Sequence, residues 1–157
     1  MVEINAYSKA KDGGKKLSTH FKVKEFACKD GSDAVLVAPR LVMVLESIRT
    51  RFNAAVRINS GYRTPQYNAK VGGVAHSQHC YGTAADITVK DQTPAAVAAY
   101  ARTLMPDWGG VGIYDSFCHI DVREAKADWR DKEDHVWQFL NTIRKTYLRR
   151  TKTALRM

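Results

Sequence analysis

Ser77-Gln-His-Cys-Tyr-Gly-Thr-Ala-Ala-Asp-Ile87 is the stretch with the densest group of chemically functional side chains in the sequence. Its second half belongs to a mostly apolar segment, Ala84–Val89, which predicts a strand, and Gly82 before it predicts a tight turn. Because small residues follow the glycine, the loop can fold back and bring His79 and Asp86 to one point. An imidazole nitrogen and a carboxylate oxygen suit a zinc ion, and a catalytic zinc site needs a third protein ligand and an open position.

The third ligand is expected from Cys118-His-Ile-Asp-Val122. Side chains two apart on a strand point to the same face, so His119 and Asp121 should share a cleft while Ile120 packs on the other side. The same alternation turns the thiol of Cys118 away from the cleft. We therefore expect His79, Asp86 and His119 to hold the metal, and no thiolate to bind it.

Patterns elsewhere in the chain predict helices packed on a small, largely antiparallel sheet, which is an α+β fold. Residues 1–34 read as loops with short extended pieces. A proline followed by an apolar stripe predicts each of two helices, one beginning at Pro39 and one after Thr93. Strands are expected at 56–59 and 84–89, a hairpin at 111–114 and 118–122, and a basic amphipathic helix from about residue 132.

Composition narrows the class of protein. A length of 157 residues fits one domain, and no apolar run approaches the about 18 residues of a membrane helix. The N-terminal residues lack the pattern of a secretory signal. A net charge of +9 favours polyanionic partners such as nucleic acid, anionic lipid or anionic wall polymers. The three cysteines fit neither a disulfide framework nor a paired metal motif.

Several motifs follow one another along the chain: Phe21-Lys-Val-Lys-Glu-Phe-Ala-Cys-Lys-Asp-Gly31, Asn59-Ser-Gly-Tyr-Arg-Thr-Pro65, Gly72-Gly73, Ser77 through Asp86, Gly109-Gly-Val-Gly-Ile-Tyr114 and His119-Ile-Asp-Val-Arg123. Together they resemble the M15 family of zinc peptidases, most closely its D-alanyl-D-alanine carboxypeptidase-like branch, which includes many phage and prophage endolysins. The resemblance implies a hedgehog/D-Ala-D-Ala peptidase-like fold with one Zn²⁺ in a cleft on the sheet. It implies a single peptidase domain over residues 1–157, with a core at about 5–130 and a basic helical extension at 131–157.

The resemblance also implies roles for individual residues. His79 and Asp86 match the family's first two zinc ligands, and Arg63 matches an arginine that holds the substrate carboxylate or the developing oxyanion. Asp121 is the candidate that takes a proton from the attacking water. Many relatives carry His-x-His where this chain has His-x-Asp, so an exchange of the roles of His119 and Asp121 stays open. Further residues expected to line the cleft or to support the ligands are Ser77, Gln78 and Tyr114.

The activity that the resemblance implies is hydrolysis of a peptide bond in peptidoglycan stem or cross-link peptides by a lytic endopeptidase. The alternatives are a D-Ala-D-Ala carboxypeptidase and a wall-binding module without catalysis. We expect a monomer that has peptidoglycan and anionic wall polymers as partners, and neither nucleic acid nor membrane. Without a signal peptide, a phage or prophage product would stay in the host cytoplasm until its release to the cell wall.

Overall fold

Five strands form the main sheet, in the order β3-β4-β6-β5-β7. The chain is described by a computed structural model over residues 1–131. All neighbouring strands are antiparallel except β5 and β7, so the sheet is mixed, and together with the helices it confirms the α+β fold. The strands are β3 (Val56–Ser60), β4 (Ala84–Val89), β5 (Gly110–Ile113), β6 (Cys118–Asp121) and β7 (Ala127–Arg130).

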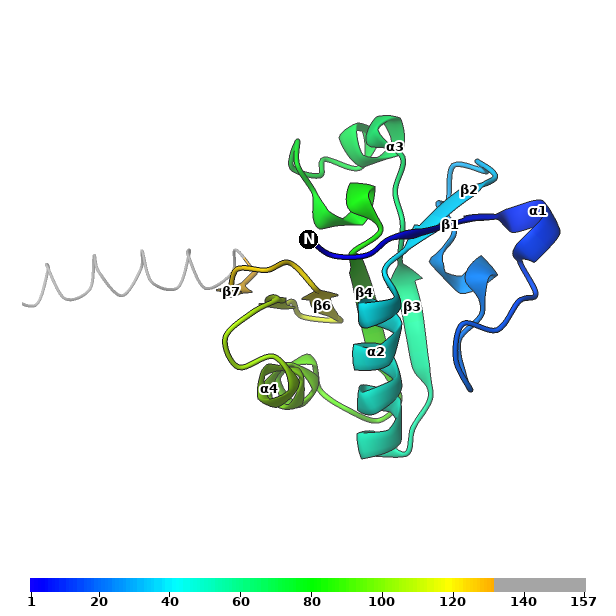
Figure 1. The fold of residues 1–157 in the computed structure, drawn as a ribbon. Helices are drawn as coiled ribbons and strands as arrows, with labels where there is room; N and C mark the ends of the chain where they lie inside the picture. The colour runs from blue at the N-terminus through cyan, green and yellow to red at the C-terminus, as the bar shows by residue number, and fades with distance from the viewer. Residues whose placement is uncertain (132–157) are drawn as a thin grey trace, which may run out of the picture.

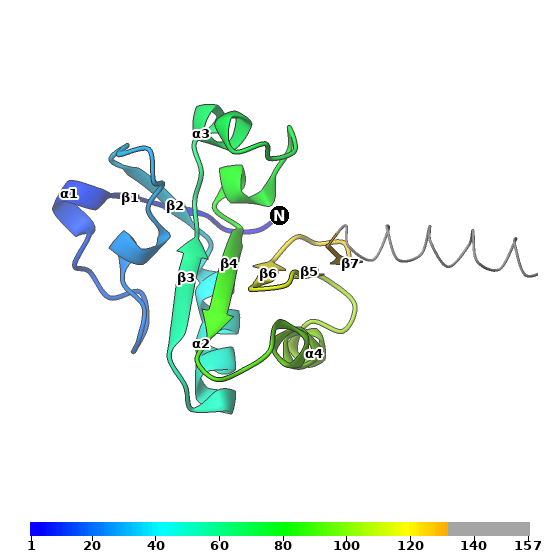
Figure 2. The same cartoon turned by 180° about the vertical axis from the view of Figure 1, so that it is seen from behind.

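Two helices cover one face of this sheet, α2 (Pro39–Phe52) over β3 and β4 and α4 (Pro94–Leu104) beside β5 and β6 (Figures 1 and 2). Both helices begin with proline at the first helical position, as predicted. In α4 the Thr93 side chain also accepts a hydrogen bond from the Ala96 backbone N–H, which satisfies one free donor of the first turn. The apolar stripe of α2, including Leu41, Leu45 and Ile48, is fully buried against the sheet.

Alternation along two central strands separates the core from the opposite face. In β4, Ala85 and Ile87 belong to the hydrophobic core beneath the helices, and Asp86 between them points away. In β6, Cys118 and Ile120 likewise enter the core. His119 and Asp121 therefore share the face that the helices leave free, as the period of two predicts.

The remaining segments surround the edge of the sheet near β3 and β4 (Figure 1). Strands β1 (Asn5–Ser8) and β2 (Ala34–Val37) form a separate antiparallel pair. Neither β2 nor helix α3 was predicted from the sequence. The short helices are α1 (Lys9–Asp12), η1 (Val23–Phe26), α3 (Pro65–Lys70) and η2 (Gln78–Tyr81).

Two further predictions concern membrane-spanning helices and the C-terminal segment. Within residues 1–131, no helix has the length and apolar character needed to cross a bilayer. The predicted basic helix from about residue 132 lies outside the described residues.

Candidate metal centre

His79 is placed by the short helix η2 and by the glycine turn that ends it. The Ser77 side chain accepts a hydrogen bond from the His79 backbone N–H at 3.3 Å and caps the helix. Gly82 ends it with φ of +72°, and a Cβ there would lie 2.5 Å from the Leu36 carbonyl oxygen, so only glycine fits. The imidazole Nδ1 lies 2.7 Å from the Gly61 carbonyl oxygen and must donate to it, which leaves Nε2 as the nitrogen with a free lone pair.

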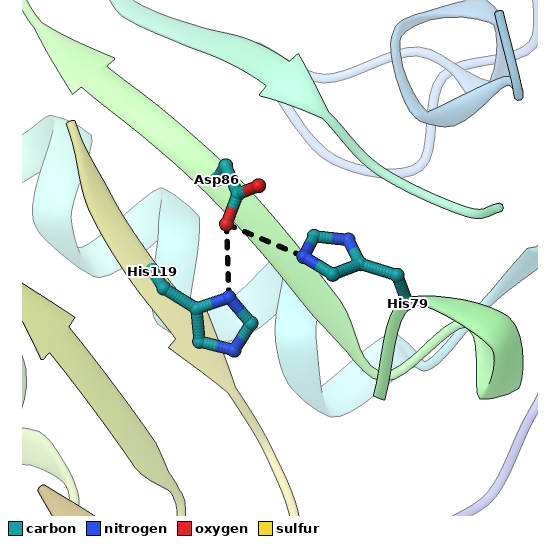
Figure 3. Close-up of side chains that lie close together, drawn as sticks. All are labelled: His79, Asp86 and His119. Carbon is teal, nitrogen blue, oxygen red and sulfur yellow. Dashed lines mark hydrogen bonds and ion pairs between the residues drawn. The ribbon is translucent and has the colours of Figure 1, made fainter. Parts of the chain in front are cut away.

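Asp86 lies between the two histidines, and one of its carboxylate oxygens is close to a ring nitrogen of each. Its Oδ1 is 3.3 Å from His79 Nε2 and 2.9 Å from His119 Nδ1. One ligand atom from each of the three residues lies within 4.8 Å of the other two, and all three side chains are buried. Figure 3 shows the side chains converging from η2, β4 and β6. The predicted His79, Asp86 and His119 group is thus brought together at one point.

Arg63 holds the other carboxylate oxygen of Asp86. Its Nη2 donates to Asp86 Oδ2 at 2.9 Å, and its Nε donates to the Ser60 hydroxyl at 2.8 Å. The register between β3 and β4 shifts just before Ser60, which brings Ser60 opposite Asp86. The Arg63 backbone N–H also donates to the His79 carbonyl oxygen, so the arginine segment and η2 are linked directly. Arg63 therefore lies beside the metal group, as its predicted role requires.

Asp121 lies on the other side of the His119 ring from Asp86. Its Oδ2 is 3.0 Å from His119 Nε2, and its side chain has no exposed surface. Arg123, two residues beyond the end of β6, approaches the same carboxylate with both Nε and Nη2. Because the His119 ring separates Asp121 from Asp86 and His79, the geometry supports His119 rather than Asp121 as the third ligand.

Strand β5 has glycine at the two positions where side chains of the site lie against its backbone. A Cβ on Gly110 would lie 2.1 Å from Asp121 Oδ2, and a Cβ on Gly112 would lie 2.4 Å from Trp129 Cε2. The Trp129 ring packs on the His119 ring with centroids 5.0 Å apart, and its Nε1 donates to the Tyr114 hydroxyl at 3.0 Å. The Gly-Val-Gly sequence thus allows both an acidic and an aromatic side chain to cross the strand.

The charges in this buried group stabilise one another. Burial alone would raise the pKa of Asp86, but the close contacts with the His119 and His79 rings outweigh it and hold that pKa well below its usual range. Burial lowers the pKa of His119, but hydrogen bonds with Asp121 and Asp86 outweigh that effect and leave the pKa raised. The two carboxylates on either side of the His119 ring therefore stay ionised.

The cysteines take no part in the metal group. Cys28, Cys80 and Cys118 are all free thiols. Cys118 lies in the hydrophobic core, and burial raises its pKa to about 12, so it stays a thiol at neutral pH. Burial also raises the pKa of Cys80. These positions agree with the expectation that no thiolate binds the metal.

The other predicted residues support the site from a distance. The Gln78 side chain accepts a hydrogen bond from the Thr83 hydroxyl at 2.8 Å and so closes the turn around Gly82. Tyr114 stacks on Phe117 with centroids 4.3 Å apart and accepts from Trp129. Their predicted roles toward substrate stay predictions.

Two residues at the site were missed by sequence reasoning. Arg123 follows His119 and Asp121 at the same spacing of two, which was the available signal. Trp129 had none, because it reaches the site through the parallel pairing of β7 with β5.

Two imidazoles and one carboxylate, with their ligand atoms gathered near one point, fit a zinc ion that keeps an open coordination position. The arrangement defines a candidate metal-dependent hydrolase. The family model for Peptidase M15 matches residues 18–121, more than half of the chain, which therefore belongs to the M15 peptidase family. A comparison with curated proteins gave no match.

Proposed function

We propose that this M15 chain is a zinc-dependent peptidase that hydrolyses a peptide bond in peptidoglycan stem or cross-link peptides, acting as a lytic endopeptidase. The observation that carries the metal dependence is the buried group of His79, Asp86 and His119, whose ligand atoms lie within 4.8 Å of one another. Family membership supports the peptidase activity. The wall substrate is supported by the resemblance to the endolysin-containing branch and by the net charge of +9, which suits an anionic wall.

In this reaction the histidines would bind the metal and Arg63 would bind the substrate. His79 and His119 present one free nitrogen each, because their second nitrogens face Gly61 and Asp121. Arg63 holds Asp86 in place through Nη2, and its remaining terminal nitrogen would take a substrate carboxylate or carbonyl oxygen. The chemistry that a bound zinc ion supplies is polarisation of the scissile carbonyl and activation of water near neutral pH.

A D-Ala-D-Ala carboxypeptidase is the second candidate, and Arg63 is the observation that favours it. A guanidinium beside the metal group can bind the terminal carboxylate that distinguishes a carboxypeptidase substrate from an internal peptide bond. The lytic role and the release of the chain from a host cytoplasm are part of the first proposal and rest on the resemblance.

The test is mass spectrometry of the products released from purified peptidoglycan by the zinc-loaded protein, with and without a chelator. New amino ends within the stem or cross-link peptides, formed only without chelator, are the expected result for the endopeptidase. Loss of terminal D-alanine alone would identify the carboxypeptidase instead.

Several wall chemotypes are needed, because the cross-link differs between them. If the zinc-loaded protein released nothing from any of them but still sedimented with the walls, the proposed peptidase activity on peptidoglycan would be wrong. A binding module without catalysis would then explain the chain better.

A further inference from the structure

The carboxylate of Asp121 accepts more hydrogen bonds than any other in the metal centre. Its Oδ1 accepts from the Gly110 backbone N–H at 3.1 Å, from the Arg123 backbone N–H at 3.1 Å and from Arg123 Nε at 2.8 Å. Its Oδ2 accepts from Arg123 Nη2 and faces His119 Nε2 at 3.0 Å. Five donors therefore surround one fully buried side chain.

These contacts leave no room for a water molecule on Asp121. A carboxylate offers about four lone-pair sites, and the five donors already occupy them. Its oxygens also lie across the His119 ring from Asp86, whereas a proton acceptor must reach the attacking water within about 3 Å. Asp121 is thus poorly placed for its predicted role and well placed to fix the imidazole.

We propose that Asp121 and Arg123 form a positioning pair that sets the tautomer and angle of His119, rather than a catalytic acid or base. By accepting from Nε2–H, Asp121 keeps the lone pair on Nδ1, the nitrogen that faces Asp86 and His79. Arg123 in turn holds both oxygens of Asp121 with its planar fork. This inference rests on the metal site of the proposed function.

The residues around Asp121 and Arg123 also restrict the movement of the His119 ring. Gly110 leaves the space in which the carboxylate sits, since a Cβ there would collide with it. Arg123 also lies over the Trp129 ring, 5.6 Å from its centroid, and the same indole packs on His119. The ring of His119 is therefore held at its edge by a carboxylate and on its face by an aromatic side chain.

The experiment measures zinc affinity rather than turnover, by competition with a chromophoric chelator. Asp121→Asn and Arg123→Gln are compared with the wild type, and the expected loss of affinity is about 10–100-fold for each. In Asp121→Asn the amide can donate to Nε2 and so favour the tautomer with its proton on Nδ1. The visible spectrum of the Co²⁺-loaded variants should also change, because the ligand geometry around His119 changes.

Two further variants control for folding and for charge. Arg123→Lys keeps the charge but loses the fork, and Arg123 is partly exposed, so this variant should fold and lose only part of the affinity. Asp128→Asn on β7 removes another carboxylate that pairs with an arginine, Arg102 of α4, away from the metal group. Its zinc affinity and Co²⁺ spectrum should match those of the wild type.

The outcomes separate this inference from the proposed function. If folded Asp121→Asn and Arg123→Gln bind zinc as tightly as the wild type, the positioning pair is disproved; a selective loss of kcat would then return Asp121 to the role of proton acceptor. If the wild type itself binds no zinc, the proposed metallopeptidase fails and the positioning pair fails with it.

Discussion

Each histidine of the metal group is oriented by the partner of its second ring nitrogen. His79 donates to a backbone carbonyl, that of Gly61, and His119 faces the carboxylate of Asp121. Both arrangements direct the remaining nitrogen toward Asp86. The site therefore depends on which ring nitrogen carries the proton as well as on the residue type. A side chain that only matches histidine in size should not replace either histidine.

The first prediction tests a ligand against a neighbour of the same type. His79→Gln should weaken zinc binding by more than the 10–100-fold expected for a supporting residue, because a direct ligand is lost. His76→Gln, three residues earlier on an exposed turn where the imidazole Nδ1 lies 3.2 Å from the Tyr81 hydroxyl, should bind like the wild type. Isothermal titration with zinc measures both. Equal binding by His79→Gln and the wild type would remove His79 from the site.

Sequence alone could supply the ligands but not what orients them. The seven-residue spacing of His79 and Asp86 around a glycine turn, and the period of two that pairs His119 with Asp121, are local patterns and were readable. The carbonyl of Gly61 was not, because every residue has one and only the fold brings this one to His79. Contacts between backbone and side chain across long separations leave no mark on composition or periodicity.

At the scale of elements, β5 shows why a strand of the sheet contains two glycines. Glycine ordinarily weakens a strand, yet here Gly112 lies beneath the Trp129 ring. Gly112→Ala should lower the free energy of unfolding by about 1–3 kcal/mol through overpacking, measured by urea denaturation. Gly14→Ala, where nothing lies within 4 Å of the added Cβ, is the control.

A double variant identifies the cause of that loss. In Trp129→Ala the indole is gone, so adding Gly112→Ala should cost much less than it does in the wild type, and the two effects should not add. Strict additivity would mean that the glycine is needed for some reason other than the space the indole occupies.

The elements differ in how far their own sequence predicts them. Helices α2 and α4 carry a proline start and an apolar stripe, and β4 is a short run of mostly apolar residues, so each was predictable from local pattern. Strand β7 is a four-residue segment, Ala-Asp-Trp-Arg, whose register is set by its partner β5 and not by an apolar period of its own. Its parallel pairing is a property of the assembled sheet.

Glu46 on α2 ties that helix to the loop before η1, and this contact should depend on pH. Its carboxylate accepts from the Ser18 hydroxyl at 2.7 Å and from the His20 ring. Burial raises the pKa of Glu46, but these hydrogen bonds outweigh it and lower the pKa below the ordinary value of about 4.5. A lowered folded-state pKa gives stability that is present above the unfolded-state pKa and is lost as pH falls through the folded-state value.

Glu46→Gln should therefore lower the free energy of unfolding by about 1 kcal/mol at pH 6 and by much less at pH 3. Urea denaturation at both pH values measures the difference, and Glu3→Gln at an exposed position is the control. A loss of equal size at pH 3 would show that the contact acts through shape and not through the ionised carboxylate.

At the scale of the whole molecule, the hydrophobic core and the candidate metal site lie on opposite faces of the main sheet. Helices α2 and α4 cover the core face, and the metal group occupies the other (Figures 1 and 3). Strands β4 and β6 contribute to both faces through alternation, so two of the three candidate ligands, Asp86 and His119, lie on central strands of the sheet. A site mounted on central strands is held more rigidly than one built on loops, which suits a metal centre that must keep an open position.

The net charge of +9 acts at the scale of the whole chain and should govern attachment to walls. Binding to purified walls, measured by sedimentation, should weaken as salt rises from about 0.05 to 0.5 M, because the screening length shrinks from above 10 Å to below 8 Å. Removal of residues 149–157 takes away four basic residues and lowers the charge from +9 to +5. The truncated chain should bind less and respond less to salt, as should a full-length chain with glutamine at those four positions. Unchanged binding and salt dependence in both would show that the C-terminal charges do not anchor the chain.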